Sequence, residues 1–180
     1  MATSTTPLTI DDFERLPAEM AEGHELADGE LVDVPGNVFI HNWLRDKLGR
    51  ILWLFVGPHG LGVVVCEQEY DFLGNAHGPD VSFFGPAKRP LLDKRKRVQR
   101  FVPDLAVEIA SQSDTDEDLL RKKNRYLKAG TKEVWLMSPE TPEVRQYTQT
   151  GARVLMGADQ ITTDLLPGFS ITVEELFRDE

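Results

Sequence analysis

One segment, residues 101–137, constrains the fold more than any other, because it reads as a strand, a helix and a second strand in succession. Its first strand, predicted over residues 105–110, is apolar except for Glu108. A carboxylate in an apolar strand is costly to bury unless it meets a cation or a hydrogen-bond donor, or its pKa rises. The sequence therefore predicts that Glu108 has a partner close by in the folded chain.

The residues after this strand predict the helix that can supply the partner. Residues 111–115 can cap it, acidic residues fill its first turn, and Gly130 ends it. At 100° per residue one arc of the helix is apolar and covers the sheet, through Leu119, Leu120, Tyr126 and Leu127. Lys123 lies near the middle of that arc and Lys122 toward one edge, so either ammonium group can reach Glu108.

Length and composition predict one soluble globular domain over residues 1–180. With 41% hydrophobic residues the chain is long enough to bury a core. No apolar run approaches the roughly 20 residues that cross a bilayer, and the opening MATSTTPLTIDDFE lacks a basic and apolar leader. The one cysteine, Cys66, excludes an internal disulfide framework and a cysteine metal cluster. We therefore expect a cytoplasmic protein without a membrane partner.

The charge is distributed unevenly along the chain. A net charge of −10 argues against general affinity for polyanions. Residues 88–100, KRPLLDKRKRVQR, nevertheless hold seven basic residues against one acidic residue, whereas the other 167 residues hold 13 basic and 29 acidic ones. This basic strip can contact a phosphate backbone, or it can be a solvated, mobile loop, and the charge run by itself favours the loop.

The remaining hydrophobic patterns predict an α/β or α+β fold with a mixed β-sheet flanked by α-helices. Apolar spacing and capping residues predict helices over residues 9–16, 38–56 and 173–177, the second of them closed by Gly57-Pro58. Asp28-Gly29 predicts the turn of a hairpin over residues 24–34. Further strands are expected over residues 62–73, 80–84, 133–137, 144–148 and 151–156.

Asp80 and Glu108 carry the predicted chemistry. Asp80 opens a strand directly after Gly78-Pro79, and Glu108 lies inside another strand. Two carboxylates from neighbouring strands can hold one Mg²⁺ or Mn²⁺ ion, and a nearby lysine can orient or deprotonate the attacking water and offset charge on the phosphate. The combination predicts phosphodiester hydrolysis. Taken singly, Asp80 also fits a turn cap, and Glu108 fits one half of a structural ion pair.

Several segments together resemble the Uma-type restriction endonuclease family, a branch of the PD-(D/E)XK nuclease superfamily. The resemblance covers nearly the whole chain and keeps the order of the segments. They are HELADGEL from His24, His41 in the first long helix, GPDVSFF from Gly78, PDLAVEIASQSD from Pro103, DLLRKKNRYLKAGTKEVWLMSP from Asp118, and LPGFSITVEELF from Leu166. The resemblance implies a restriction endonuclease-like core, which is a mixed sheet flanked by helices.

The resemblance also implies roles for the central residues. Asp80 corresponds to the metal-binding aspartate of the second motif, and Glu108 to the acidic residue of the third. In this family the lysine has moved from the strand, where Ala110 stands, to the following helix. The spacing of the family's helix residues selects Lys122, although the helical arc favours Lys123. We follow the spacing, because a long side chain at the edge of a face can swing inward.

Further positions match residues that face the same pocket in the family. The resemblance implies that Glu25 is an outer metal ligand or binds a metal-bound water, that His41 touches the scissile phosphate, and that Ile109 offers its carbonyl oxygen to the metal. A strand-pairing carboxylate and a helix-capping imidazole are the structural alternatives for Glu25 and His41. Gln112 and Asp114 replace the family's usual proline and threonine in the loop after the central strand.

We therefore expect a Mg²⁺- or Mn²⁺-dependent DNA endonuclease, with the basic strip as a loop that faces the DNA. A homodimer suits this function, because cutting both strands is easiest with two sites related by a two-fold axis. The alternatives are a catalytically silent nuclease-fold module that binds nucleic acid or protein partners, and a non-nuclease protein in which the pocket is only a structural ion-pair network.

Overall fold

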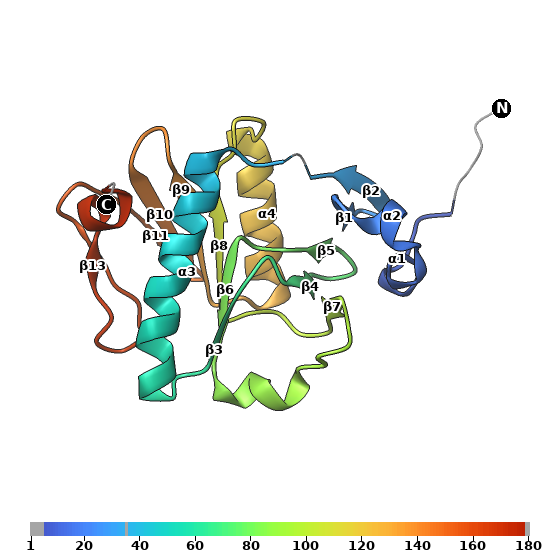
Figure 1. The fold of residues 1–180 in the computed structure, drawn as a ribbon, viewed down its shortest axis with the longest axis horizontal. Helices are drawn as coiled ribbons and strands as arrows, with labels where there is room; N and C mark the ends of the chain where they lie inside the picture. Colours follow the sequence, from blue (N-terminus) through green and yellow to red (C-terminus); the bar gives the residue numbers. More distant parts are fainter. Residues whose placement is uncertain (1–5, 35, 179–180) are drawn as a thin grey trace.

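The computed structural model describes residues 6–34 and 36–178. The first five residues of the opening segment, in which we expect no leader sequence, lie outside the described residues. A six-stranded mixed sheet forms the centre of the fold, in the order β11-β10-β9-β8-β6-β3. Its strands are β3 (Val63–Cys66), β6 (Val81–Phe84), β8 (Leu105–Ile109), β9 (Glu133–Ser138), β10 (Glu143–Thr148) and β11 (Ala152–Met156). Only β8 and β9 pair in parallel within this sheet. Helix α4 (Asp116–Ala129) joins them, which confirms the predicted strand, helix and strand (Figure 1).

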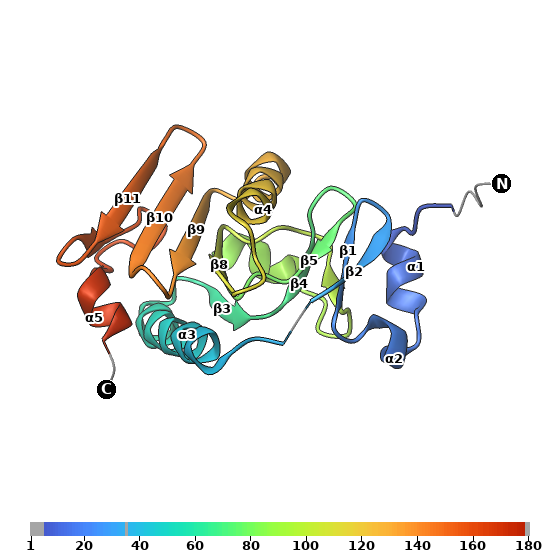
Figure 2. The same cartoon turned by 90° about the horizontal axis from the view of Figure 1, so that it is seen from above.

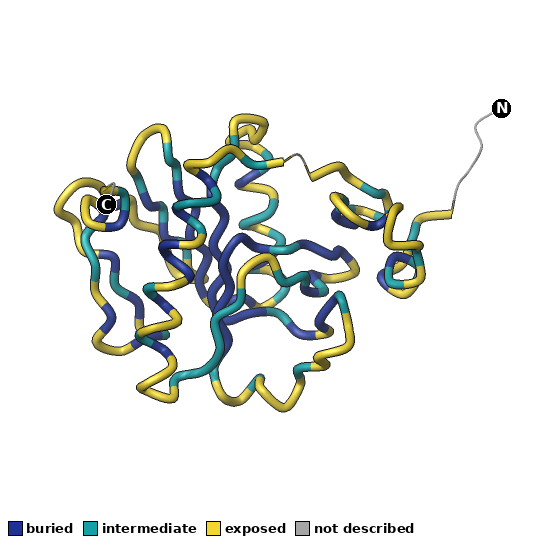
Figure 3. Tube along the Cα trace, in the orientation of Figure 1, coloured by how far each residue is buried: buried dark blue, intermediate teal, exposed yellow. Residues whose placement is uncertain are grey.

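Two long helices cover opposite faces of this sheet, α3 (Phe39–His59) on one side and α4 on the other (Figures 1 and 2). Val107 and Ile109 of β8 pack in one buried cluster with the apolar residues of α3. Ala106 packs in a second cluster with Tyr126 of α4. Because successive side chains of a strand point to opposite faces, Glu108 shares the α4 face with Ala106. Figure 3 shows that the buried part of the trace is concentrated in these central strands.

A second sheet of five short strands lies beside the first, in the order β2-β1-β5-β4-β7. The predicted hairpin is confirmed, since β1 and β2 pair antiparallel around Asp28 and Gly29, both of which have positive φ. Two short helices, α1 (Ile10–Arg15) and α2 (Ala18–Ala21), pack their buried residues against it. The strands are β1 (His24–Ala27), β2 (Glu30–Asp33), β4 (Glu69–Asp71), β5 (Ala76–His77) and β7 (Val98–Gln99).

The structure corrects the single strand that we predicted over residues 62–73. This segment forms β3 in the six-stranded sheet and β4 in the five-stranded sheet. Glu67, between them, adopts φ of 54°, and its N–H donates to the carbonyls of Pro79 and Asp80. A left-handed backbone is uncommon for residues other than glycine, so the alternating pattern gave no sign of the break. The break lets the chain pass from one sheet to the other.

The end of α3 also differs from the prediction. The helix does not close at Gly57-Pro58 but continues to His59, with Pro58 inside its last turn. Gly60 ends it in the left-handed conformation, at φ of 63°, and donates its N–H to the carbonyls of Val56 and Gly57. Glycine takes this conformation without the steric cost that a Cβ atom brings.

The C-terminal residues extend the core on the α3 side of the central sheet. The hairpin of β12 (Gln160–Ile161) and β13 (Ile171–Thr172) leads into α5 (Val173–Phe177), as predicted for the last helix. Ile161, Phe169 and Leu176 are buried in the same cluster as the apolar residues of α3. In the described part of the chain, no helix combines the length and the apolar character that crossing a membrane requires.

Candidate active site

A pocket of about 530 Å³ brings together the residues that the sequence singled out. Its lining includes Glu25 of β1, His41 of α3, Asp80 before β6, Glu108 of β8 and Lys122 of α4. These residues come from both sheets and both long helices. Because Ile109 ends β8 and His41 lies in the first turn of α3, the pocket is at the end of the central sheet where β8 ends and α3 begins.

Glu108 is held by two hydrogen-bond donors although it is only 5% exposed. The Tyr126 hydroxyl donates to its Oε1 at 2.6 Å, and Lys122 Nζ lies 3.3 Å from its Oε2. Burial raises the pKa of Glu108, the Lys122 ammonium opposes this, and the Asp80 and Glu25 carboxylates raise the pKa further, to about 7. The expected partner of this buried carboxylate is therefore present, but it does not cancel the whole cost of burial.

Asp80 is fixed between β8 and α3. Its Oδ2 accepts a 2.7 Å hydrogen bond from the N–H of Ile109, and its Oδ1 lies 3.3 Å from His41 Nε2. Burial lowers the pKa of the His41 imidazole, but the Asp80 carboxylate outweighs burial and the pKa is raised. His41 Nδ1 is buried without a hydrogen-bond partner among the described residues.

Lys122 lies between two carboxylates. Its Nζ is 3.2 Å from Glu25 Oε2 and 3.3 Å from Glu108 Oε2. Burial lowers the pKa of Lys122, but Glu108 and Glu25 outweigh this and raise the pKa, so the group is an ammonium at neutral pH. Lys123 points elsewhere, with its Nζ 4.7 Å from the ring centroid of Tyr147. The structure thus places the lysine selected by the family spacing in the pocket.

Glu25 turns its side chain from β1 into the pocket. Its Oε2 lies 2.9 Å from His77 Nδ1, and its Oε1 accepts the N–H of Gly78 at 3.0 Å. Burial raises the pKa of Glu25, but the hydrogen bond from His77 and the charge of Lys122 outweigh burial, and the pKa falls to about 2. Glu25 is therefore an anion throughout the physiological range.

Two further residues contact the predicted set, Tyr126 through Glu108 and His77 through Glu25, and a third, Arg125, contacts His77. The sequence did not assign these residues a role. Tyr126 was placed on the apolar face of α4, and neither His77 nor Arg125 was proposed as a site residue. Tyr126 lies one turn after Lys122, and His77 directly precedes Gly78-Pro79-Asp80. These two spacings are the signals that could have pointed to them.

The lining of the pocket has an excess of negative charge. It contains three basic side chains, from Arg121, Lys122 and Arg125, and seven carboxylates, from Glu25, Asp28, Asp33, Asp80, Glu108, Asp114 and Asp118. The residues described hold no group of three or more His, Cys, Asp or Glu side chains placed to bind a metal ion. Asp80 and Glu108 still offer the hard oxygen donors that Mg²⁺ and Mn²⁺ prefer, and Mg²⁺ is commonly held by one or two carboxylates with water and phosphate. The donor set and the charge therefore fit a cation.

The basic strip does not take part in this pocket. Among the described residues that line it, none comes from residues 88–100. The strip begins in the 3₁₀ helix η1 (Pro86–Leu91), which Figure 1 places at the opposite end of the central sheet from the start of α3.

Much of the strip's charge is used within the fold. Ion pairs join the strip to other segments, with N to O distances of 2.9 Å for Lys88 and Asp104, 3.0 Å for Lys96 and Glu14, 2.6 Å for Arg97 and Glu69, and 3.4 Å for Arg100 and Asp71. Arg89, Lys94 and Arg95 are exposed and form no ion pair with any described residue. The strip therefore does not flank the carboxylates, and its role as a loop that faces the DNA stays a prediction.

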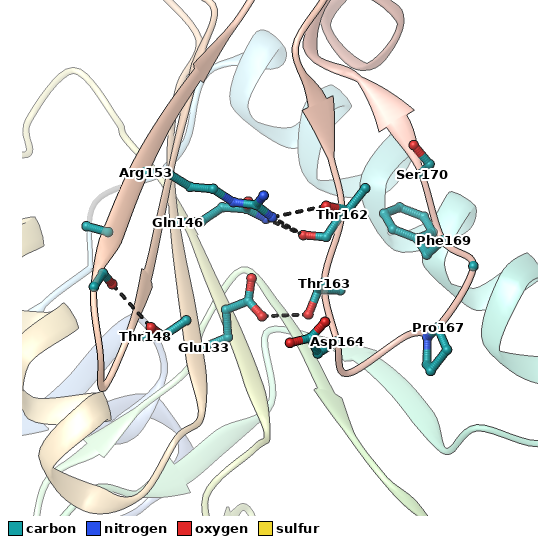
Figure 4. Close-up of a pocket in the computed structure, with 13 residues that line it drawn as sticks. Glu133, Gln146, Thr148, Arg153, Thr162, Thr163, Asp164, Pro167, Phe169 and Ser170 are labelled. Carbon is teal, nitrogen blue, oxygen red and sulfur yellow. Dashed lines mark hydrogen bonds between the residues drawn. The ribbon is translucent and has the colours of Figure 1, made fainter.

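A larger pocket, of about 710 Å³, lies between β10, β11 and the loop that joins β12 to β13 (Figure 4). Its buried Glu133 accepts hydrogen bonds from Trp135 Nε1 at 2.7 Å and from the Thr163 hydroxyl at 2.5 Å. Arg153 donates to Gln146 Oε1 at 2.6 Å. These polar groups satisfy one another, and the residues proposed from the sequence line the other pocket, so this one is not the candidate active site.

A mixed sheet flanked by helices, with acidic side chains and a lysine gathered at one end, defines the class of restriction endonuclease-like proteins. A model of the Uma2 family, described as "Putative restriction endonuclease", matches residues 10–174, and the chain belongs to this family. Among solved structures the chain is similar to "a putative nuclease belonging to DUF820" from Anabaena variabilis ATCC 29413, with a TM-score of 0.83 and 22% identity over 95% of this chain and 98% of that one. This likeness shows the shared fold. No curated protein matches the sequence.

Proposed function

We propose that this protein is a metal-dependent endonuclease of the PD-(D/E)XK type that hydrolyses phosphodiester bonds in DNA. The observation that carries the proposal is the meeting of Asp80, Glu108 and Lys122, from three separate elements, in one pocket. Membership of the family and the shared nuclease fold support it.

In this proposal Asp80 and Glu108 hold a Mg²⁺ or Mn²⁺ ion, with the carbonyl of Ile109 as a further oxygen donor. When bound, such an ion polarises a phosphoryl oxygen and lowers the pKa of water. The excess of carboxylates in the pocket repels a phosphate in the absence of a cation. This explains in physical terms why activity should depend on the metal.

Lys122 acts as a donor and a positive charge. Its raised pKa argues that it remains an ammonium at neutral pH, so we assign it to hydrogen bonding and to offsetting charge on the phosphate, and not to deprotonating the water. Glu25 and Glu108 hold the ammonium from two sides. In this proposal Glu25 therefore helps to hold Lys122 in position.

We assign His41 to the orientation of Asp80. The imidazole is only 3% exposed, and its Nε2 faces Asp80 Oδ1 at 3.3 Å. This geometry supports an action through Asp80 more directly than a contact with the scissile phosphate. The helix-capping alternative has no support, because α3 has no side-chain cap in the structure.

Cleavage of supercoiled plasmid with Mg²⁺ or Mn²⁺ tests the proposal. We expect Asp80→Asn, Glu108→Gln and Lys122→Met each to reduce the cleavage rate at least about 100-fold. Lys123→Met is the matched control, because it removes the adjacent ammonium that contacts Tyr147, and it should cleave at nearly the wild-type rate. A wild type that cuts no DNA with either metal, while the variants remain folded, contradicts the proposal.

A catalytically silent module that binds nucleic acid or a protein is the second candidate. The observation in its favour is that both oxygens of Glu108 already have hydrogen-bond donors within the protein, Tyr126 and Lys122. DNA binding without turnover, weakened by salt and by substitution of residues 94–97, would support it. A cytoplasmic location and a homodimer remain part of the first proposal, and sedimentation at two salt concentrations tests the dimer.

A further inference from the structure

His77 stands at the centre of a chain of polar contacts in the wall of the pocket. It belongs to β5, is 2% exposed, and its ring lies near those of Phe72 and Tyr126. Its Nδ1 is 2.9 Å from Glu25 Oε2, and its Nε2 is 2.7 Å from Arg125 Nη1. Each ring nitrogen therefore has one polar partner, an anion on one side and a cation on the other.

These two partners determine where the imidazole carries its proton. The guanidinium of Arg125 can only donate hydrogen bonds, so His77 Nε2 must accept and carries no proton. Nδ1 then carries the proton and donates it to Glu25. Arg125 is itself held by Asp28, whose two carboxylate oxygens lie 2.9 Å from Arg125 Nη2. The ion pair of Arg125 and Asp28 thus determines which ring nitrogen of His77 carries the proton.

We propose that His77, as the neutral tautomer with its proton on Nδ1, is a positioning residue that holds Glu25 and, through Glu25, the ammonium of Lys122. The inference rests on the proposed function, in which Lys122 serves phosphodiester hydrolysis. His77 itself does not touch the substrate in this scheme.

The position of Lys122 depends on Glu25 having a fixed orientation. Glu25 is held at Oε1 by the N–H of Gly78 and at Oε2 by His77. Lys122 can then divide its contacts between Glu25 and Glu108. Without the donor on His77, Glu25 Oε2 loses one partner and keeps Lys122, so the carboxylate is held less firmly and Lys122 moves toward Glu108.

Two substitutions of His77 test the roles of its two ring nitrogens separately. In His77→Asn the amide nitrogen is attached at the same atom as Nδ1, so it can still donate to Glu25. In His77→Gln the amide reaches the region of Nε2, so it can accept from Arg125 but leaves Glu25 without its donor. Both variants remove the aromatic ring, and each serves as the packing control for the other.

We expect His77→Gln to lower kcat for plasmid cleavage about 10- to 100-fold, the range typical of groups that orient a metal-site residue, with KM for DNA nearly unchanged. His77→Asn should stay within about three-fold of the wild type, because the donor to Glu25 is kept. Equal losses in the two variants would show that His77 only fills space, and would overturn the proposal.

A readout without DNA or metal keeps this test separate from the proposed function. In ¹⁵N NMR spectra of the metal-free protein, His77 should be protonated at Nδ1 only, and Arg125→Met should remove that preference. The ammonium signal of Lys122 should be protected from exchange in the wild type and in His77→Asn, and lost in His77→Gln. A proton on Nε2, or an unchanged ammonium signal in His77→Gln, overturns the inference. If these signals behave as expected and the wild type still cuts no DNA, the proposed function fails and the positioning stands.

Discussion

The N–H of Ile109 donates a 2.7 Å hydrogen bond to Oδ2 of Asp80, and this contact joins the end of β8 to the start of β6. Ile109 directly follows Glu108, so the same contact places the two acidic residues at one end of the sheet. Asp80 is 9% exposed, and its hydrogen bond is buried. Asp80 thus has a structural role in addition to its proposed role as a metal ligand.

Asp80→Ala and Asp80→Asn should separate these two roles. Asparagine can still accept the N–H of Ile109 through its amide oxygen, whereas alanine leaves this buried N–H without its partner. We expect Asp80→Ala to lower the free energy of unfolding by about 1–3 kcal/mol more than Asp80→Asn does. Both should abolish cleavage. Urea denaturation measures the difference, and equal stabilities would contradict the structural role of Asp80.

Tyr126→Phe should destabilise the protein in a pH-dependent way. The Tyr126 hydroxyl donates to Glu108 Oε1, while its ring stacks on Phe72 with centroids 4.0 Å apart, so phenylalanine loses only the hydrogen bond. Above pH 7 Glu108 is ionised and the loss should be about 1.5–3 kcal/mol, as for a bond to a charged group; well below pH 7 it should fall to about 1 kcal/mol.

Tyr70→Phe is the matched control for this prediction. Tyr70 is also fully buried and its hydroxyl hydrogen-bonds to the neutral Ser82 hydroxyl at 2.8 Å. Its loss of about 1 kcal/mol should not change between pH 5 and pH 8. Denaturant titrations at pH 5 and pH 8 measure the loss of unfolding free energy in each variant. The same pH dependence of this loss in Tyr126→Phe and Tyr70→Phe would contradict a charged Glu108.

Glu108→Gln should stabilise the metal-free protein at alkaline pH. The pKa of Glu108 is about 7 in the folded state, above its ordinary value of 4.5. Below pH 4.5 the group is protonated in both states and its ionisation has no effect on stability. Well above pH 7 it is ionised in both states, and the folded state then carries an electrostatic cost that glutamine avoids. Unfolding free energies at pH 4.5 and pH 8 test this, and a variant that is less stable than the wild type at pH 8 would contradict it.

Divalent metal should stabilise the wild type through the same two carboxylates. At a Mn²⁺ concentration 100 times the Kd, the gain is about 2.7 kcal/mol, seen as a higher Tm. Asp80→Asn and Glu108→Gln should lose most of this gain, whereas Lys123→Met should keep it. The gain should also shrink below pH 7, because protonated Glu108 binds metal poorly. Equal shifts in Glu108→Gln and the wild type would exclude Glu108 as a ligand.

Arg97→Ala should destabilise the fold, although Arg97 lies in the basic strip. Its guanidinium contacts both oxygens of Glu69 and the carbonyls of Ala21 and His24, and it lies 4.3 Å from the ring centroid of Phe13. We expect a loss of about 2 kcal/mol or more in urea denaturation.

Arg95→Ala is the control for Arg97→Ala, because the exposed Arg95 makes no ion pair with the described residues. Its effect on stability should stay within about 0.5 kcal/mol. If neither Arg97→Ala nor Arg95→Ala lowered the free energy of unfolding, the strip would be a solvated loop.

The sequence by itself determined the features that depend on neighbouring residues. The apolar residues around Glu108 required a buried strand and a partner for its carboxylate, and Lys122 and Tyr126 meet that requirement. Thr115 caps α4 and Gly130 ends it, as their residue types indicated. The Asp28-Gly29 turn follows from the ability of these residues to take positive φ. Hydrogen bonding and backbone sterics within a few residues decide these features.

Only the tertiary structure decided which side chains meet across segments. Local pattern favoured Lys123, yet the packing of α4 turns Lys122 toward Glu25 and Glu108. His77 acquires its two partners because Glu67 breaks the strand and sends the chain into the second sheet. The relative positions of two sheets and two helices depend on how their apolar faces pack, and the hydrophobic pattern of one segment does not specify the distance to another.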